Sequence, residues 1–386
     1  MKHLSRNDRT LVGRWFWTID KTLLTLVLLL IGLGVIAVAA ASPAAAHRYS
    51  GGSVRVDDLF YLKRQILWVL AGVPLMLATS MLPVHWAKRV AIAGTIVCLL
   101  ALFAVPFIGV EVNGAVRWIQ LPGFAFQPSE FLKPMFVIAT AWLLAARFDD
   151  KTLPTMQLSF GLLIVIAGLL VKQPDFGQTA LIAVVWGAQA VLAGMSVLVI
   201  GGLACLAVAG MGVAYLTSTH VAERIDHFVK GTGDTYQIDR ALDCFKAGGL
   251  FGAGPGEGQM KFRLPEAQTD YIFSVIGEEF GAIACFMLAI LYLAIVVRVL
   301  LQLLDEEEPF IFLAAGGLAI QFGLQAAINM AVNLALLPSK GMTLPFVSHG
   351  GSSFLALSIG MGLLLALTRR NPYLKASPYV TGARAA

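Results

Sequence analysis

Charged residues are scarce in this chain. Only 13% of its 386 residues are Asp, Glu, Lys or Arg, whereas 58% are hydrophobic, and the mean hydropathy is +0.78. Soluble domains carry about 25% charged residues, so this composition excludes an ordinary soluble domain and predicts a membrane protein. The net charge of +5 comes mostly from residues at the ends of apolar runs, so no basic patch for a nucleic acid is present.

Cysteine is rare as well. The cysteines Cys98, Cys205, Cys244 and Cys285 form no CxxC pair, so neither a zinc site nor a disulfide framework is predicted. The sequence also lacks an HExxH helix and a Ser/His/Asp arrangement, which leaves metalloprotease and serine hydrolase chemistry without a motif. Segments of alternating polarity are absent, which excludes a membrane β-barrel.

Long apolar runs are what the chain has instead. They predict an all-α polytopic membrane protein of about ten transmembrane helices. Ala44-Ala45-Ala46 imitates a signal-peptide cleavage site, but the run before it has the length of a span, and we expect it to be retained. The expected spans are 22–42, 65–82, 90–109, 130–147, 155–172, 178–194, 197–217, 271–303, 310–332 and 351–368.

Lysine and arginine near the span ends predict the orientation. If both termini are cytoplasmic, one side of the membrane holds the lysines and arginines of the N-terminal segment and those after the second, fourth and tenth spans. Only Lys63 and Arg64, before the second span, then lie on the other side and argue against this orientation. We therefore expect a single transmembrane domain over residues 1–386 with cytoplasmic tails 1–20 and 370–386. One large extracytoplasmic loop, 218–270, joins the seventh and eighth spans, and polar loops 111–127 and 333–350 share its face.

The stretch Lys261–Gly281 closes the largest loop and opens a very apolar helix. Pro265 ends any earlier helix and makes Leu264 extended, so we expect the helix to begin near Thr269. Asp270 then stands at the membrane boundary, where partial desolvation raises the pKa of a carboxylate and strengthens it as a base. The alternative is that Asp270 only favours the helix N-terminus through the helix dipole.

Three other motifs each allow two interpretations. Glu130 and Lys133 are i,i+3 neighbours in the fourth span, so we expect an ion pair that either ties the span to a neighbour or lines the active cavity. Asp175 is expected to cap the sixth span, with direct ligand contact as the alternative. Gly248–Gly258 has neither Rossmann nor Walker spacing, so it is expected to be a tight-turning loop or to contact a pyrophosphate through its N–H groups.

Four motifs, in one order along the chain, resemble the SEDS family, the FtsW/RodA group. The resemblance covers nearly all of the chain and implies ten transmembrane helices and a peptidoglycan glycosyltransferase that polymerises lipid II outside the bacterial cytoplasmic membrane. The sequence Pro-Glu-Ala-Gln-Thr-Asp resembles the division branch of the family, which acts at the septum, more than the elongation branch of RodA type. The motifs are Gln127–Lys133, Pro174–Gly177, Pro265–Glu279 and Leu337–Phe346.

The resemblance implies that Asp270 is the essential catalytic carboxylate and that Glu130 and Lys133 form the family's intramembrane ion pair. The chain departs from the pattern at His349, where many members carry Tyr. Cations would stabilise the leaving pyrophosphate, and Arg117, Lys261, Arg263 and Lys340 are the candidates for that role. The full set of substrate-binding candidates is Arg117, Trp118, Lys261, Arg263, Lys340, Ser348 and His349.

The expected partners follow from the same resemblance. They are lipid II, a glycan chain linked to undecaprenyl pyrophosphate, a class B penicillin-binding protein with transpeptidase activity, and other division proteins. No metal-ligand cluster is visible in the sequence, and a requirement for Mg²⁺ or Mn²⁺ is left open. Two rival functions remain, a carrier that moves lipid II across the membrane and a non-catalytic scaffold of the division machinery; the polar residues at the outer rim favour the enzyme over the carrier.

Overall fold

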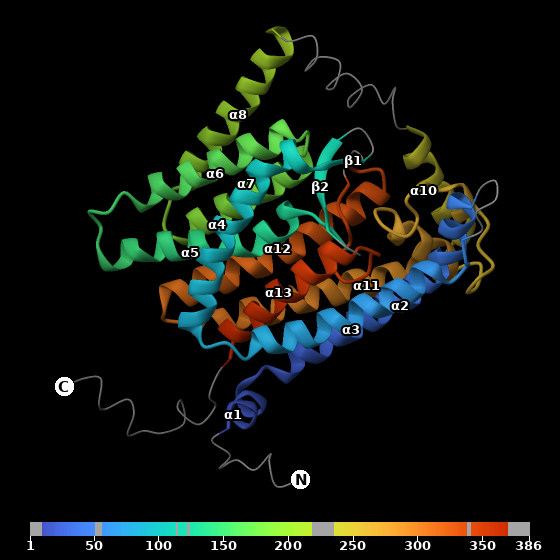
Figure 1. Ribbon diagram of the computed structural model, residues 1–386, viewed down its shortest axis with the longest axis horizontal. Helices are drawn as coiled ribbons and strands as arrows, with labels where there is room; N and C mark the ends of the chain where they lie inside the picture. The colour runs from blue at the N-terminus through green and yellow to red at the C-terminus, as the bar shows by residue number, and fades with distance from the viewer. Residues whose placement is uncertain are drawn as a thin grey trace.

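Long apolar helices run side by side through the molecule (Figure 1). The computed structural model describes residues 10–50, 56–112, 115–121, 124–217, 235–337 and 341–369. In this part of the chain, 7 helices are long and apolar enough to cross a membrane. They are α2 (Lys21–Tyr49), α3 (Phe60–Ser80), α4 (Val84–Ile108), α5 (Pro128–Asp149), α6 (Thr155–Lys172), α11 (Ile272–Leu303) and α12 (Pro309–Asn333).

Further apolar helices are α7 (Phe176–Leu192), α8 (Val197–Thr217) and α13 (Gly351–Leu367). Together with the long helices they coincide with the predicted apolar runs, so the prediction of an all-α polytopic membrane protein is confirmed. The largest differences are at α2, which ends at Tyr49 instead of 42, and at α3 and α4, which begin at Phe60 and Val84 instead of 65 and 90. The first turns of α3 and α4 are too polar to be part of an apolar run, because they contain Lys63, Arg64, Lys88 and Arg89.

Four smaller pieces of structure were not predicted. Helix α1 (Leu11–Thr18) occupies part of the expected N-terminal tail, and helix α10 (Thr235–Gly248) and the 3₁₀ helix η2 (Met260–Arg263) lie in the expected large loop. The loop after α4 contains an antiparallel sheet of β1 (Val110–Val112), β2 (Ala115–Leu121) and β3 (Phe124–Phe126), in that order. Residues 218–234 of the large loop lie outside the described residues.

Helix α11 is not the continuous span that the sequence predicts. Gly281 has φ 82° and ψ 174°, which breaks the helix between residue 280 and residue 282. Two backbone N–H groups freed by the break are taken up by the turn after α10, since Ala282 N donates to Gly249 O at 2.9 Å and Ile283 N to Leu250 O at 3.3 Å. The end of α10 is therefore part of the joint that bends α11.

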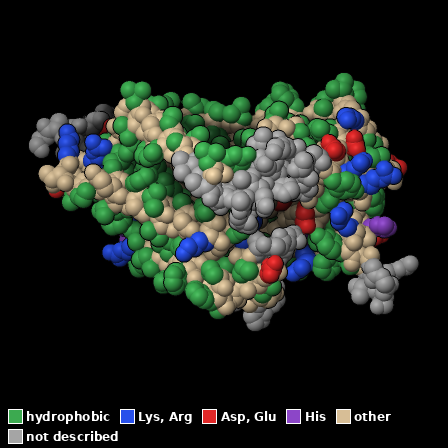
Figure 2. All heavy atoms as spheres, turned by 90° about the horizontal axis from the view of Figure 1, so that it is seen from above, with side chains coloured by type: hydrophobic (Ala, Val, Ile, Leu, Met, Phe, Trp, Pro, Cys, Tyr) green, Lys and Arg blue, Asp and Glu red, His purple; other side chains and the backbone are tan. Residues whose placement is uncertain are grey.

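The two ends of the helix bundle differ. One end, which we call the loop end, carries the β-sheet, α10, the start of α11 and residues 341–350 (Figure 1). At the opposite end, Arg298 Nε pairs with Asp20 Oδ2 at 2.8 Å and Arg369 Nη2 donates to Leu82 O at 2.6 Å. Hydrophobic side chains cover most of the face in Figure 2, and charged ones gather mainly toward its two ends, as a bilayer requires.

Helices α5 and α12 form the centre of the bundle. In each, 61% of the apolar window is buried, a larger share than in the other long helices of the described chain. Polar side chains in a membrane protein are tolerated where they face the bundle interior. These two helices can therefore carry buried polar groups toward the loop end.

Candidate active site

Asp270 lies in the turn that leads into α11. Leu264 is extended, with φ −86° and ψ 116°, as Pro265 predicts, and α11 begins at Ile272, three residues after the expected start at Thr269. The side chain of Asp270 is half-buried. In the described part of the chain, no hydrogen bond or ion pair engages its carboxylate, so the group is free to take a proton.

The surroundings of Asp270 make its carboxyl group a stronger base. Burial, followed by the negative charges of Glu266 and Glu130, raises the pKa of Asp270 to about 7. Glu266 is held nearby because its carboxylate accepts from Tyr49 Oη at 3.1 Å and from Thr269 Oγ1 at 2.8 Å. Such a pKa suits a general base at neutral pH. The N-cap of α11 is Tyr271, so Asp270 does not cap the helix.

Residues 341–350 lie against the segment that carries Asp270. Ser348 Oγ donates to Thr269 O at 2.6 Å, and His349 N donates to Gln268 O at 2.8 Å. A Cβ atom added at Gly341 would lie 3.4 Å from Asp270 Oδ2. The structure therefore brings Asp270, Ser348 and His349 together, and the expected cation Lys340 precedes Gly341 but lies outside the described residues.

His349 is held by α3. Its Nδ1 lies 3.1 Å from Gln65 Oε1, and its ring meets that of Tyr61 edge to face at 5.3 Å. Burial, and to a smaller extent the charge of Arg64, lowers the pKa of His349 to about 4. The imidazole is therefore neutral at pH 7, and it can hydrogen-bond a sugar but cannot act as a cation for a pyrophosphate.

Arg117 and Trp118 lie on β2, and both side chains are half-buried. Arg117 Nε donates to Gln173 O at 3.0 Å and its Nη2 donates to Pro174 O at 2.6 Å. The guanidinium thus ties the sheet to the turn between α6 and α7. Among the described contacts none joins Arg117 directly to the Asp270 segment.

The other two expected cations differ in accessibility. Lys261 is buried, and its ammonium is bound by Glu279 and by Ala40 O, the latter at 3.0 Å. Arg263 is exposed on η2. A buried ammonium with both partners in place favours a structural role for Lys261, whereas Arg263 is accessible to a ligand.

The glycine-rich loop Gly248–Gly258 and the 3₁₀ helix η2 that follows it bind carboxylates of the chain itself. Gly256 N donates to Glu279 Oε2, and Met260 N and Lys261 N donate to the carboxylate of Glu278 at 2.6 and 2.8 Å. These contacts support the interpretation of a tight-turning loop. Within the loop, the N–H of Gly256 already binds Glu279, and those of Ala253 and Gly254 bind the carbonyls of Glu278 and Glu279, so the contacts do not support binding of a pyrophosphate.

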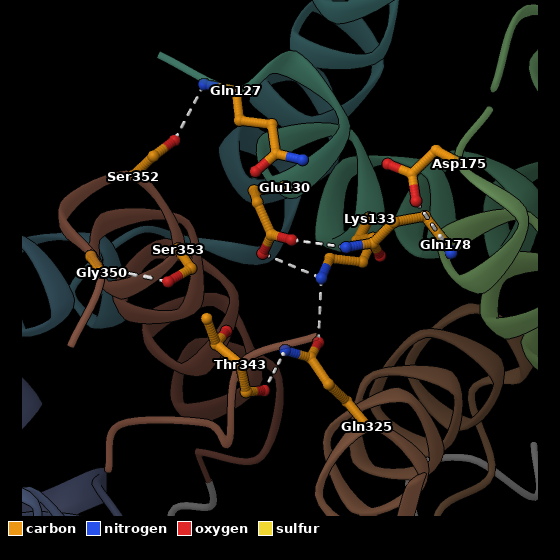
Figure 3. A network of polar contacts seen from close by, with 10 residues as sticks. All are labelled: Gln127, Glu130, Lys133, Asp175, Gln178, Gln325, Thr343, Gly350, Ser352 and Ser353. Atoms are coloured by element: carbon orange, nitrogen blue, oxygen red, sulfur yellow. Dashed lines mark hydrogen bonds and ion pairs between the residues drawn. The ribbon is translucent and has the colours of Figure 1, made fainter. Parts of the chain in front are cut away.

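A buried polar network connects α5, α7 and α12 (Figure 3). Lys133 Nζ lies 2.8 Å from Glu130 Oε2, so the expected ion pair is present, and both side chains are buried. Gln178 Nε2 donates to Glu130 Oε1 at 2.7 Å, and Lys133 Nζ donates to Gln325 Oε1 at 3.0 Å. Asp175 caps α7 as predicted, through a bond of 3.5 Å from Gln178 N.

Sequence reasoning missed two residues of this region, Gln325 and Asn329, and took Asn333 for a loop residue. The signal was present, because amides recur every fourth residue along α12, which is otherwise apolar. Four-residue spacing puts side chains on one helix face. No group of three or more His, Cys, Asp or Glu suited to a metal ion occurs within the described residues.

Comparisons with known proteins agree with this geometry. A profile of the FtsW/RodA/SpoVE family, described as cell cycle protein, matches residues 21–373. A protein of Caulobacter vibrioides named "Probable peptidoglycan glycosyltransferase FtsW" is 42% identical over 370 residues, which cover 95% of this chain and 94% of the relative. A protein of the same name from Nitrosomonas europaea is 35% identical over 92% of this chain and 93% of its own length.

Two solved structures share the fold. One is a chain described under "Structural coordination of polymerization and crosslinking by a peptidoglycan synthase complex", with a TM-score of 0.73 and 26% identity, covering 91% of this chain and 97% of the other. The second is the rod shape determining protein RodA of Thermus thermophilus, with a TM-score of 0.66 and 26% identity, covering 91% of this chain and 96% of the other.

Proposed function

This chain belongs to the FtsW/RodA/SpoVE family, and from that premise we propose that it is a peptidoglycan glycosyltransferase that joins lipid II units into β(1→4) glycan strands. The observation that carries the proposal is the half-buried carboxylate of Asp270, which has a pKa of about 7 and no partner among the described residues. The division branch is supported by relatives named FtsW over most of the chain, with a RodA-type role in elongation as the alternative.

The reaction needs one proton acceptor. Asp270 accepts the proton of the 4-hydroxyl of the GlcNAc of lipid II, and the oxygen attacks the anomeric carbon of the donor MurNAc. The bond from that carbon to the pyrophosphate breaks, and undecaprenyl pyrophosphate leaves with the electron pair. Attack opposite the leaving group turns the α-linked donor into a β(1→4) product. The base requires hydrogen-bond reach to the hydroxyl, about 2.6–3.2 Å.

The surrounding residues orient the sugars and the phosphates. His349 adjoins the Asp270 segment and is suited to hydrogen-bond the saccharides. Ser348 is buried and its hydroxyl already donates to Thr269 O and accepts from Leu344 N, which favours a structural role. Arg263, Arg117 and Lys340 remain the candidates for the pyrophosphate, with Trp118 beside Arg117 on β2. A divalent cation would add charge stabilisation to the leaving group, and no step above depends on it.

The site belongs on the outer side of the cytoplasmic membrane. The loop end then faces outward, both termini are cytoplasmic, and the ten apolar helices of the single domain cross the bilayer. The prenyl tails stay in lipid, which explains a site at the bilayer rim. The class B penicillin-binding protein is a fitting partner, because the similar solved chain comes from work on a complex for polymerization and crosslinking.

The first prediction concerns Asp270→Asn. The variant keeps the shape of the side chain but cannot accept a proton, so detergent-solubilised protein should lose strand synthesis from lipid II by a factor of about 10² or more. Asp149→Asn is the matched control, because Asp149 is exposed at the other end of α5. Strand length and yield on gels, with and without the transpeptidase partner, give the measurement.

The same assay separates the rival functions. A lipid carrier has no bilayer to cross in detergent and makes no strands, and a scaffold makes none either. Strand synthesis by wild type and by Asp149→Asn, together with its loss in Asp270→Asn, supports the enzyme. Normal synthesis by Asp270→Asn would refute the assignment of the base.

A further inference from the structure

Three amide side chains line one face of α12 at four-residue intervals, and we call them the amide ladder. They are Gln325, Asn329 and Asn333, with exposed fractions of 0%, 2% and 0%. Polar groups buried in a membrane protein are unfavourable unless they are hydrogen-bonded. The partners of these amides therefore indicate why an otherwise apolar helix contains them.

The first member joins the ion pair to residues 341–350. Gln325 Oε1 accepts from Lys133 Nζ at 3.0 Å, and Gln325 Nε2 donates to Thr343 O at 3.0 Å (Figure 3). The reverse orientation of the amide would set its NH₂ against an ammonium and its oxygen against a carbonyl. Lys133, itself paired with Glu130, thus determines which way Gln325 points.

The other two members hold the segment that carries the catalytic carboxylate. Asn329 Nδ2 donates to Met342 O at 2.7 Å and to Asp270 O at 2.9 Å. Asn333 Nδ2 donates to Asp270 O at 2.9 Å, and its Oδ1 accepts from Ser274 N at 3.0 Å. The carbonyl of Asp270 is therefore bound twice by one helix, while its carboxylate has no hydrogen-bond or ion-pair partner among the described residues.

We propose that the amide ladder is a positioning device, which holds the Asp270 segment and residues 342–343 at a fixed separation and takes its orientation from the Glu130–Lys133 ion pair. The Asp270 segment and residues 342–343 form the two walls of the site and lie about 70 residues apart in the sequence. Helix α12 is the rigid element to which both walls are hydrogen-bonded. The inference rests on the proposed role of Asp270 as the base. On this inference Glu130 and Lys133 are positioning residues, which act on the site through Gln325 and not by touching the substrate.

The chain offers a matched control in Gln321, one turn before Gln325 on the same face of α12. Gln321 is also buried, with 6% exposed. It lines a cavity of about 20 Å³ beside Glu130 and Lys133, and its Oε1 has no hydrogen-bond partner within the described residues. Gln321 is therefore a buried amide of the same type that bonds to neither wall of the site.

The test compares Gln325→Leu and Asn329→Leu with Gln321→Leu in the full-length, detergent-solubilised protein, with rates normalised to folded protein. A displaced catalytic group can cost about 10²-fold, so we expect the two ladder variants to lose strand synthesis by roughly 10- to 100-fold, and Gln321→Leu to stay within about twofold of wild type. If the leucine variants do not fold, Gln325→Met replaces them, because it removes both hydrogen bonds of that amide at nearly constant side-chain length and adds no charge near Asp270.

The pH–rate profile distinguishes positioning from loss of folded protein. A looser segment admits water to the carboxyl group of Asp270, while Glu266 and Glu130 still face it, so the acid limb of the profile should move to lower pH. A smaller active fraction only scales the profile. Ladder variants that match Gln321→Leu, or that lose rate with an unmoved acid limb, would overturn the inference. Wild type that makes no strands would instead refute the proposed function.

Discussion

The ionisation of Asp270 gives a prediction for the pH dependence of the enzyme. A general base must be ionised, and burial with the charges of Glu266 and Glu130 raises the pKa of this carboxyl group to about 7. Strand synthesis should therefore rise with pH and be half-maximal near pH 7. Glu266→Gln removes one of the negative charges, so it should lower the pKa of Asp270 and move the acid limb to lower pH.

The matched control for this measurement is Glu257→Gln. Glu257 is exposed in the glycine-rich loop and is not among the groups that raise the pKa of Asp270. Initial rates between pH 5 and pH 9 give the two profiles. An acid limb that is the same in Glu266→Gln, Glu257→Gln and wild type would contradict the electrostatic argument.

Single residues differ in how far the sequence could place them. Asp270 was predictable because it is the acid at the boundary between a polar loop and an apolar helix. Lys261 was not, because a cation near the site looks the same in the sequence whether it faces a ligand or, as here, the buried carboxylate of Glu279. Asn329 shows the opposite case, since its partners are carbonyls of Asp270 and Met342 that no side-chain pattern reveals.

The break in α11 gives a prediction about a joint between two elements. A Cβ atom at Gly281 would lie 2.3 Å from Leu250 O and 2.5 Å from Gly252 N, and φ is 82°. Gly281→Ala must therefore push the turn after α10 away from α11, and backbone strain of this kind costs about 1–3 kcal/mol before the clash is added. We expect a lower midpoint of thermal unfolding in detergent.

A second glycine provides the comparison. Gly161 lies in α6 with nothing within 4 Å of an added Cβ. Gly161→Ala should leave the unfolding midpoint unchanged or raise it slightly, because alanine is the better helix former. Equal midpoints for the two alanine variants would show that the joint at Gly281 can relax without cost.

The long helices were predictable as elements, but the joints between them were not. Lipid requires about twenty apolar residues in each span, and the runs 155–172 and 197–217 coincide with α6 and α8. The break at Gly281 depends on the turn after α10, which is distant in the sequence. The β-sheet at 110–126 is likewise held by strand pairings such as Val110 with Trp118 and Ile119 with Phe126. Such pairings could not be predicted from the sequence of a short loop.

The proposed chemistry depends on which side of the membrane the loop end faces. Asp270 and residues 341–350 share that end with the turn before α3, whereas Asp20, Arg298 and the acidic turn before α12 lie at the other. Lipid-linked sugars reach Asp270 only if the loop end is extracytoplasmic. Orientation is therefore a property of the whole molecule that the activity of Asp270 requires.

Cysteine labelling tests this orientation. Asp58 is exposed in the turn before α3 and Glu307 is exposed in the turn before α12. In a Cys205→Ala background, which removes the one exposed cysteine of the described chain, a membrane-impermeant maleimide should label Asp58→Cys in intact spheroplasts and Glu307→Cys only after permeabilisation. Equal labelling of both variants in detergent is the control. The reverse pattern would place Asp270 in the cytosol, where an enzyme that extends external glycan strands has no substrate.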